Sequence, residues 1–421
     1  MRIVKSCDLP CQFWSSGRPG VSVDVDPLIE QVRQGGDQAV REMTLRFDGV
    51  NLAEFRVSDD LLERSITNVG CRVLESIDIA ADNIRRFAEK QFECFQSFEW
   101  ESQQGVWLGQ RVIPLDSAGI YVPGGRFPLI SSVLMGVIPA QVAGVARVVV
   151  CSPPTFNGAI HPAILAAAYR LGAREVYAVG GVQAIAALAY GTESIPSVAK
   201  IVGPGNRYVA AAKKRVYGHV GIDFIAGPSE VLIISDGKGR AQWAAADLLA
   251  QAEHDPDAGV VLLCPESDFL QQVDQSVQEQ LQGLPTAAVA TQAIAENGWL
   301  VQVADLNEAV EIANRKAPEH LELQVENPDL WINQLNAYGS LFIGEYAVEA
   351  LGDYSAGLNH TLPTSAAARY TGGLSVKDFI KITTTLRCNA MGALSLAPAA
   401  QVLAQAEGLH AHERSVAIRR N

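Results

Sequence analysis

The stretch that decides the fold runs from residue 118 to residue 206, where four short apolar segments each end in a loop of glycine and proline. They read AGIYVPGG (118–125), RVVVCSPP (147–154), EVYAVGG (175–181) and KIVGPGN (200–206). Alanine-rich segments of helical character, 159–171 and 182–190, lie between them. Alternating buried strand, loop and helix is typical of βαβ units and of a doubly wound parallel sheet. Because such sheets bind ligands beyond the carboxyl ends of their strands, we expect these loops at a ligand site.

A second series of apolar segments predicts a second α/β sheet, with a long helix near 241–253 inside it. Residues 21–115 read as helical, with a break at Gly35–Gly36, and the tail after about residue 375 reads as a helical arm that Gly392 and Pro398 interrupt. The second series reads EVLIISD (230–236), GVVLLCP (259–265), WLVQVAD (299–305), LELQV (321–325) and SLFIG (340–344).

These patterns predict the α/β fold class, with two Rossmann-like doubly wound parallel-sheet domains, an N-terminal helical segment and a C-terminal helical arm. A chain of 421 residues is long enough for more than one core. We assign residues 1–117 and 231–372 to the first α/β domain, with its N-terminal helices, residues 118–230 to the second, and residues 373–421 to the arm.

Charge, cysteine content and hydropathy narrow the class of protein. A net charge of −13 without any lysine- or arginine-rich run argues against nucleic acid as a partner. Seven scattered cysteines without CxxC pairs suit reduced thiols, and the first residues lack an apolar signal segment, so we expect a cytoplasmic protein. Residues 128–146 carry no charge, but Pro139, Gln141, serines and glycines favour a buried strand–helix connection over a membrane span.

Candidate metal ligands lie in three segments, and each also has an ordinary explanation. Gln251 and His254 stand three apart at the end of a predicted helix, so they point to one side, although a solvated helix end explains them better. Asp353 follows Gly352 in a loop of small residues, where an Asx turn is an equally good explanation. His412 lies on an apparent helix beside His410, and one of the two is an ordinary surface histidine. Such nitrogen and oxygen ligands suit zinc, cobalt or manganese.

Two further groups of polar residues are candidates for catalysis and for cofactor binding. Glu319 and His320 form a credible acid–base pair if a loop after Pro318 presents both to one site, while a surface ion pair at a strand entry is the alternative. The standard dinucleotide fingerprint is absent. The three Gly loops instead carry one polar side chain each, and three such loops in consecutive βα units favour a ligand site over plain turns. These side chains are Tyr121, Gln183 and Asn206.

Many long motifs, in one order over nearly the whole chain, resemble those of the histidinol dehydrogenase family. The segments most alike include RQGGDQAVREMTLRFDG (33–49), SSVLMGVIPAQVAGV (131–145), VGGVQAIAALAYGTESIP (179–196), GIDFIAGPSEVLIISD (221–236), DLLAQAEHDPDA (247–258), GSLFIGEYAVEALGDYSAGLNHTLP (339–363) and EGLHAHERSVAIR (407–419).

The resemblance assigns roles to residues of this chain. It implies that Glu319 and His320 are the acid–base residues, and that residues 118–230 form the NAD side and the other α/β domain the zinc and substrate side. It implies one Zn²⁺ per subunit on Gln251, His254, Asp353 and His412. It implies NAD⁺ contacts at Tyr121, Gln183 and Asn206. It implies contacts with L-histidinol at Ser229, Gln251, His254, His320, Asp353, Glu407 and His412.

The family reaction comprises two successive NAD-dependent oxidations of L-histidinol, through L-histidinaldehyde, to L-histidine. The resemblance also implies a homodimer, because the arm that carries Glu407 and His412 reaches the neighbouring subunit in relatives. Two departures from the family's pattern concern loop geometry: Ser365-Ala366 stands where Gly-Gly is frequent, and Gly136 where Asn is common.

Two alternatives stay open at this stage. One is a paralogous zinc and NAD dehydrogenase of another small primary alcohol, against which the presence of Glu407 argues. The other is a non-catalytic protein whose metal only fixes the arm to the core. Structural zinc sites usually use four Cys or His ligands, whereas this predicted site has Gln and Asp beside a Glu-His pair.

Overall fold

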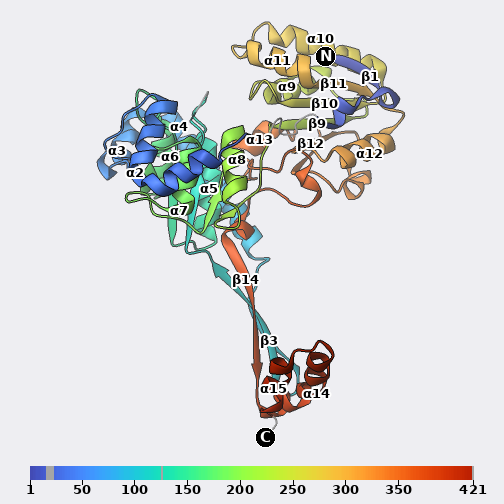
Figure 1. Ribbon diagram of the computed structural model, residues 1–421. Helices are drawn as coiled ribbons and strands as arrows, with labels where there is room; N and C mark the ends of the chain where they lie inside the picture. Colours follow the sequence, from blue (N-terminus) through green and yellow to red (C-terminus); the bar gives the residue numbers. More distant parts are fainter. Residues whose placement is uncertain (16–22, 125–126, 420–421) are drawn as a thin grey trace.

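The computed structural model describes residues 1–15, 23–124 and 127–419, which form two parallel sheets with their helices and a long antiparallel arm (Figure 1). Gly125, the last residue of the first Gly loop, lies outside the described residues. Within the described ranges, no helix is long and apolar enough to cross a membrane.

The four apolar segments of the first series and a fifth strand, β8, which we did not predict, form a parallel sheet of order β6-β5-β4-β7-β8. Taken in chain order, the strands lie 3-2-1-4-5, so the direction of winding reverses between β4 and β7. This doubly wound order confirms the predicted fold class and places the loops after β4 and β7 at the reversal. The strands are β4 (Ser117–Tyr121), β5 (Arg147–Cys151), β6 (Glu175–Tyr177), β7 (Lys200–Val202) and β8 (Gly221–Ile222).

Two hydrophobic cores cover the faces of this sheet, and both include N-terminal helices. On one face α5 and α6 lie between the sheet and α3 and α4, while on the other α2 packs against α7 and α8. Within α2, Gly36 has non-helical φ and ψ values, so the predicted Gly-Gly break is present. The helices are α2 (Asp26–Asp48), α3 (Asp59–Ser65), α4 (Cys71–Phe92), α5 (Ile130–Val142), α6 (Pro162–Arg170), α7 (Gly181–Tyr190) and α8 (Arg207–Val216).

The position of α2–α4 corrects one expectation, since we grouped residues 1–117 with the other sheet. Ile77, Ala80 and Ile84 do form a buried helical face, but it packs in the core of the five-stranded sheet. Helical periodicity identifies the buried face of a helix and says nothing about its partner. The boundaries between domains remain a prediction.

The second series forms a six-stranded parallel sheet of order β1-β11-β10-β9-β12-β13. Apart from the edge strand β1, which we did not predict, it repeats the order 3-2-1-4-5. Helices α9–α11 pack on one face and α12, with Phe13 of α1, on the other. The elements are β1 (Arg2–Lys5), α1 (Cys11–Ser15), β9 (Glu230–Ser235), α9 (Ala241–Ala252), β10 (Gly259–Cys264), α10 (Ser267–Leu281), α11 (Ala287–Asn297), β11 (Gly298–Gln302), α12 (Leu306–Lys316), β12 (His320–Gln324) and β13 (Ser340–Ile343).

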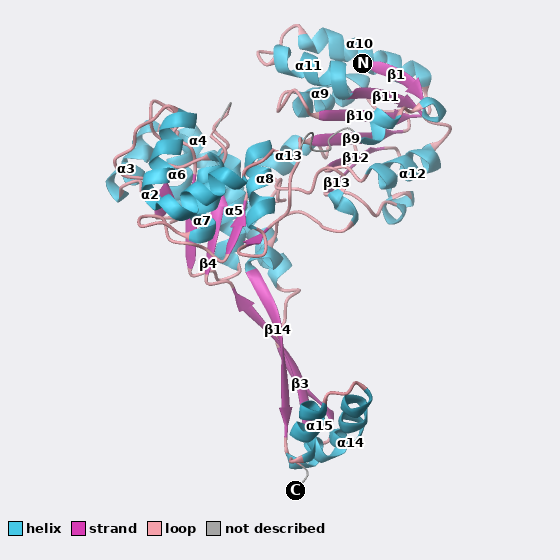
Figure 2. Cartoon of the chain, in the orientation of Figure 1, coloured by secondary structure: helices cyan, strands magenta, loops and turns pink. Residues whose placement is uncertain are grey.

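The arm is a three-stranded antiparallel sheet that ends in two helices (Figure 2). Its strands correct the expectation that the chain is helical up to residue 115 and again after about residue 375. Gly392 and Pro398 also lie inside one helix instead of interrupting it. Nine-residue strands carry the terminal helices about 30 Å from the parallel sheets. The elements are β2 (Phe98–Gln103), β3 (Val106–Pro114), β14 (Ile380–Cys388), α14 (Ala390–Ala406) and α15 (His410–Ala417).

The structure explains Gly136, one of the two departures from the family's pattern. Gly136 lies in α5, and a Cβ atom there would stand 2.3 Å from Cγ2 of Ile120 in β4. The helix therefore approaches the sheet more closely than any side chain at position 136 would allow.

Candidate active site

His320 and Glu319 stand where β12 begins, at the amino ends of the parallel strands. The helix α12 ends at Lys316, Ala317 adopts a left-handed conformation, and Pro318 leads into the strand. His320 pairs with Val231 of β9 in the central part of the sheet, so its side chain is buried. This edge is opposite to the carboxyl edge at which doubly wound sheets usually bind nucleotides.

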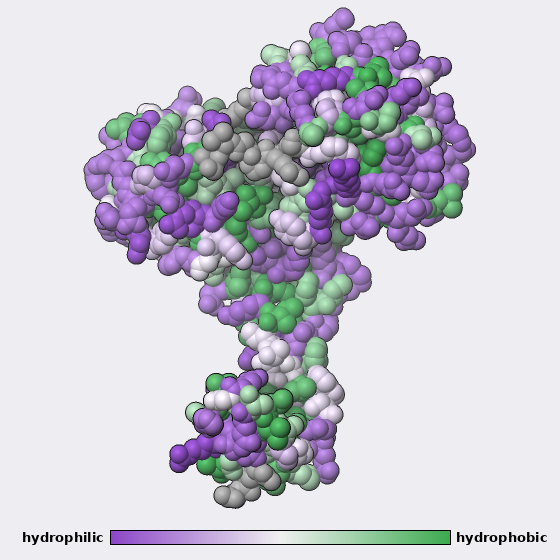
Figure 3. Space-filling view, turned by 45° about the vertical axis from the view of Figure 1, so that its right-hand side comes forward, coloured by the Kyte–Doolittle hydropathy of each residue, from purple (hydrophilic) through white to green (hydrophobic). Residues whose placement is uncertain are grey.

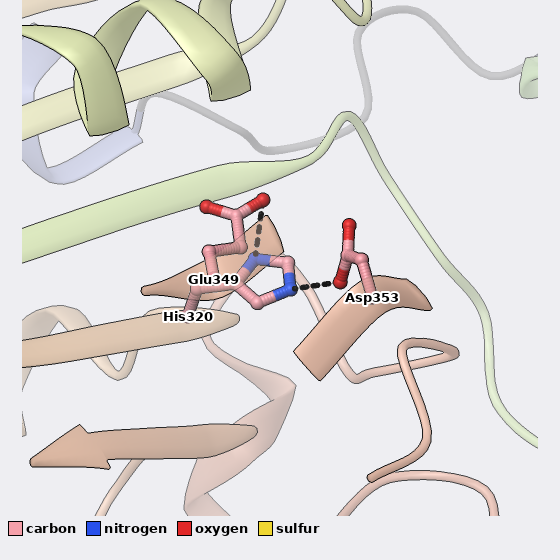
Figure 4. Close-up of side chains that lie close together, drawn as sticks. All are labelled: His320, Glu349 and Asp353. Atoms are coloured by element: carbon pink, nitrogen blue, oxygen red, sulfur yellow. Dashed lines mark ion pairs between the residues drawn. The ribbon is translucent and has the colours of Figure 1, made fainter. Parts of the chain in front are cut away.

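Carboxylate groups surround the ring of His320 on several sides (Figure 4). Its Nδ1 lies 3.7 Å from Oε1 of Glu349 and 3.8 Å from Oε2 of Glu319, and its Nε2 lies 3.6 Å from Oδ1 of Asp353. Glu349 and Asp353 belong to α13 (Glu349–Tyr354), where a spacing of four places both on one side of the helix.

Hydrogen bonding distinguishes the two ring nitrogens of His320. Nδ1 lies 3.3 Å from the backbone carbonyl oxygen of Glu230, which can only accept, so Nδ1 carries a proton. In the neutral ring Nε2 then holds the free electron pair. Nε2 is buried and makes no hydrogen bond to any described residue. When the ring is neutral, His320 can therefore offer Nε2 as a base to a bound molecule.

The charges around His320 control its protonation. Burial alone would lower the pKa of His320, but the carboxylates of Glu349, Glu319 and Asp353 outweigh burial and hold this pKa well above its usual value. Burial also raises the pKa of Asp353, but the interaction with His320 and the charges of His360 and His254 hold it below its usual value. Asp353 is therefore an anion, and it is suited to a cationic partner.

Glu319 is a buried carboxyl group held in place by the backbone. Its Oε2 accepts a hydrogen bond of 2.9 Å from the backbone N–H of Glu230. Burial raises the pKa of Glu319 to about 8, although the charge of His320 and the hydrogen bond from Glu230 oppose the shift. A carboxyl group with such a pKa is a stronger base than an ordinary glutamate near neutral pH.

The structure brings some of the predicted metal ligands together. Gln251 is fully buried at the end of α9, and with its amide group turned to satisfy its neighbours, its nitrogen donates to both carboxylate oxygens of Glu349, at 2.5 and 2.9 Å. His254 follows α9 and interacts electrostatically with Asp353. Ser229 directly precedes Glu230, whose carbonyl contacts His320. These residues all lie at the amino edge of the six-stranded sheet.

Glu407 and His412, by contrast, lie far from this group within the same chain. Glu407 caps the end of α14 and His412 lies in α15, so both sit at the tip of the arm, where they are exposed (Figure 1). A single subunit therefore does not gather all the residues that the resemblance implied.

Sequence reasoning missed Glu349 and His360. Glu349 is buried beside His320, and with Asp353 these residues form a group whose ligand atoms lie within 4.8 Å of one another, close enough to hold a metal ion. His360 interacts with Asp353, and its buried Nε2 has no partner among the described residues. Two acidic residues four apart in the segment EALGDY would have indicated a shared helical face, had the segment been read as a helix.

A second layer of carboxyl groups positions α13. Oε1 of Glu322 accepts a hydrogen bond of 3.0 Å from the backbone N–H of Glu349, the first residue of α13. The side chain of Gln324 donates to Oε2 of Glu322 and to Oδ2 of Asp247, each at 2.8 Å. Burial raises the pKa of Glu322 to about 8 and that of Asp247 to about 6. The start of α13 is thus held by a buried network.

These carboxyl groups should make the stability of the metal-free protein depend on pH. An unfolded glutamate titrates near 4.5, whereas Glu319 and Glu322 titrate at about 8 in the folded chain. The stabilisation from these two protons is complete below pH 4.5 and is lost as the pH rises to about 8, and the raised pKa of His320 acts in the same direction. We expect the free energy of unfolding to fall by about 1.4 kcal/mol per pH unit for each retained proton.

Urea unfolding between pH 7 and pH 8 measures this slope, because below pH 7 the lowered pKa values of the buried His254 and His360 act in the opposite direction. The Glu322→Gln variant removes one of the titrating groups and should show a shallower slope. A stability that is constant or that rises over this range would contradict the assigned protonation states.

The predicted cofactor residues lie at the carboxyl ends of β4, β6 and β7 of the other sheet, and Tyr121 is the last residue of β4. Tyr121 is buried, and its hydroxyl accepts a hydrogen bond of 3.1 Å from the backbone N–H of Gly181. Gln183 is also buried, in the first turn of α7. Asn206 caps α8, since its Oδ1 accepts from the N–H groups of Tyr208 and Val209. All three therefore belong to the carboxyl edge of the sheet.

A buried ion pair fixes the loop that carries Asn206. The backbone N–H of Gly203 donates to Oδ2 of Asp223 at 2.8 Å, its carbonyl oxygen accepts from Nζ of Lys213 at 2.8 Å, and Lys213 and Asp223 form an ion pair. Gly203 has φ +117°, and a Cβ there would stand 2.1 Å from the carbonyl oxygen of Tyr121. Only glycine fits this position.

Ser365 and Ala366 adopt left-handed φ values of 57° and 62°, which glycine tolerates best. The backbone N–H of Ser365 donates to Oε1 of Glu230 at 3.0 Å. The loop of Ser365 and Ala366 therefore has a strained backbone, and it still forms a hydrogen bond with Glu230 next to the active site.

Together, the fold and the site define an α/β enzyme with two doubly wound sheets, in which a buried Glu-His pair is placed to move protons. The family model described as histidinol dehydrogenase matches residues 16–420. The chain belongs to the histidinol dehydrogenase family and is an oxidoreductase.

Individual relatives agree over almost the whole length. The chain is 47% identical over 395 residues to the histidinol dehydrogenase of Pseudomonas savastanoi pv. phaseolicola, covering 93% of this chain and 88% of the relative. It is 46% identical over 410 residues to that of Chromobacterium violaceum, covering 97% and 94%. The crystal structure of histidinol dehydrogenase from Elizabethkingia anophelis superposes with a TM-score of 0.92 at 37% identity, covering 99% and 97%.

Proposed function

We propose that this protein oxidises L-histidinol through L-histidinaldehyde to L-histidine with two NAD⁺, as the last steps of histidine biosynthesis, in the cytoplasm. The observation that carries the proposal is the buried Glu319–His320 pair beside Asp353, in a chain of this family. NAD⁺ supplies the hydride acceptor for both oxidations when it is bound. The seven free cysteines suit the reducing cytoplasm, and burial raises the pKa of Cys151 and Cys264 to about 12, so these two are poor nucleophiles.

His320 is the proposed base for the alcohol. When the ring is neutral, its buried Nε2, which has no hydrogen-bond partner among the described residues, can accept the hydroxyl proton of a substrate placed between His320 and Asp353. The contact of Nδ1 with the carbonyl of Glu230 keeps the ring in the required tautomer and orientation.

Glu319 is the proposed base for the water that attacks the aldehyde. Its replacement by glutamine should slow oxidation of L-histidinaldehyde by about a hundredfold to a thousandfold, because the amide cannot accept the proton of water. The rate of the first oxidation, that of L-histidinol, should fall much less in this variant. Rapid-mixing measurements with each substrate separate the two steps. Equal losses in both steps would contradict a role confined to the second.

We propose that a single metal ion binds to Gln251, His254 and Asp353. When the nitrogen of Gln251 donates to Glu349, the amide oxygen points away from that carboxylate and is the atom that would bind a cation. Asp353 supplies an anionic oxygen and His254 a ring nitrogen, a mixture that suits zinc. Zinc, when bound, would orient the substrate through its nitrogen atoms. This arrangement leaves His320 free as a base, whereas a metal on His320, Glu349 and Asp353 would occupy it.

The fourth ligand, His412, and the substrate contact Glu407 come in this proposal from a second subunit. The arm extends away from its own active site, and apolar side chains lie exposed along it (Figure 3). Because so much apolar surface is exposed on the arm, we expect the arm to pack against another copy of the chain. The most exposed large examples are Leu386, Val402, Leu403 and Ile418.

The carboxyl edge of the five-stranded sheet is the proposed NAD⁺ site. The loops that carry Tyr121 and Asn206 follow β4 and β7, the strands between which the winding reverses, and Gln183 lies in the neighbouring turn. This reversal is where doubly wound sheets bind dinucleotides.

Product analysis with the zinc-loaded protein tests the proposed function. With L-histidinol we expect two NADH and one L-histidine per substrate consumed. A panel of other small primary alcohols serves as the comparison. Turnover of another alcohol, together with inactivity toward L-histidinol, would overturn the substrate assignment.

A further inference from the structure

The strand that usually supplies an acidic residue for dinucleotide recognition lacks one here. In doubly wound folds the acidic residue that binds the adenosine ribose commonly lies about 20 residues beyond the first Gly loop. In this sheet the second strand, β5, ends at Cys151, and Ser152, Pro153 and Pro154 follow it. The end of β5 therefore offers the ribose no carboxylate.

Asp48 brings a carboxylate to this edge from outside the sheet. It is the last residue of α2, which packs against α7. Its Oδ2 lies 3.4 Å from Nε2 of Gln183, and its charge interacts with Tyr121. Asp48 thus lies beside two of the three residues proposed for the cofactor.

The carboxylate of Asp48 lacks a strong partner. It is half-buried, and among the described residues no lysine, arginine or histidine forms an ion pair with it. The contact with Gln183 is at the long limit of a hydrogen bond. Burial raises the pKa of Asp48, and no charge from the described part of the chain offsets this shift. A partly desolvated carboxylate of this kind gains from neutral donors such as hydroxyl groups.

We propose that Asp48 accepts hydrogen bonds from the ribose hydroxyls of the adenosine half of NAD⁺ and thereby selects NAD⁺ over NADP⁺. A phosphate on the 2′ oxygen would remove one donor and place negative charge against the carboxylate. The inference rests on the proposed NAD⁺ site at Tyr121, Gln183 and Asn206.

The Asp48→Asn variant tests this role. The amide keeps the shape of the side chain but removes its charge. We expect the KM for NAD⁺ to rise about tenfold, and the ratio of kcat/KM for NAD⁺ to that for NADP⁺ to fall by at least about tenfold, with the KM for L-histidinol unchanged. Asp48→Ala should shift the same quantities in the same direction. The matched control is Glu54→Gln, an exposed carboxylate in the loop after α2.

The outcomes separate this inference from the cofactor site itself. If the wild-type protein uses both cofactors equally well, or if both Asp48 variants, folded by their melting curves, keep the wild-type ratio, Asp48 does not select the cofactor. If Asn206→Ala leaves NAD⁺ binding intact in direct titration, the proposed cofactor site is wrong instead.

Discussion

Replacing His320 with asparagine is expected to lower kcat for L-histidinol by about a thousandfold while the fold and the metal content stay intact. Asparagine can still donate a hydrogen bond to the carbonyl of Glu230, as Nδ1 of His320 does. It has no counterpart of Nε2, the buried nitrogen that faces Asp353. The first oxidation therefore loses its base without losing the local backbone contact.

Steady-state NADH formation, a thermal melt and metal analysis measure this prediction. His219→Asn is the matched control, since His219 stacks on Tyr190 beside the other sheet and should tolerate the change. If chelation and His320→Asn both leave the fold intact and abolish NADH formation, the metal is not merely structural. A His320→Asn enzyme with near-normal kcat would remove His320 from the mechanism.

Mixing two inactive variants should restore activity, because each active site takes its arm from the other subunit. In a mixed dimer of His320→Asn and His412→Ala chains, one site carries both defects. The other combines an intact core with the intact arm of the His320→Asn chain. With random pairing, half of the dimers are mixed and about a quarter of the wild-type activity returns.

Coexpression of the two variants with different affinity tags isolates the mixed dimers. The tandem-purified mixed dimer should have about half of the wild-type activity, and the two homodimers should be almost inactive. A mixed dimer as inactive as both parents would mean that the arm serves its own subunit or none.

The alternation of strand and helix was sufficient to predict both parallel sheets. Buried parallel strands such as GVVLLCP are apolar throughout, and glycine or proline ends them, so their pattern is local. The arm was not predictable in the same way. β14 alternates apolar residues such as Ile382 and Leu386 with polar ones, but most of its residues are exposed, and its partner β3 lies more than 250 residues away.

The residues of the candidate site also differ in how far the sequence alone could predict them. Local reading of Gln251, His254 and Asp353 could not decide between a metal site and ordinary helix ends or turns, since their neighbourhood depends on tertiary contacts. The resemblance to the family identified these residues as one set of metal ligands. The structure adds Glu349, which contacts His320, and the hydrogen-bond network of Glu322, which holds α13 beside His320. Asp48 was equally hidden, because only the packing of α2 on α7 brings it to Gln183.

The most direct test of this account is a crystal structure of the dimer with zinc and L-histidinol, with anomalous scattering recorded at the zinc edge. We expect one peak per active site, bonded to Gln251, His254 and Asp353 of one subunit and to the partner subunit's His412, with Nε2 of His320 facing the substrate hydroxyl. A peak bonded to His320, Glu349 and Asp353, with His412 remote from both sites, would contradict it.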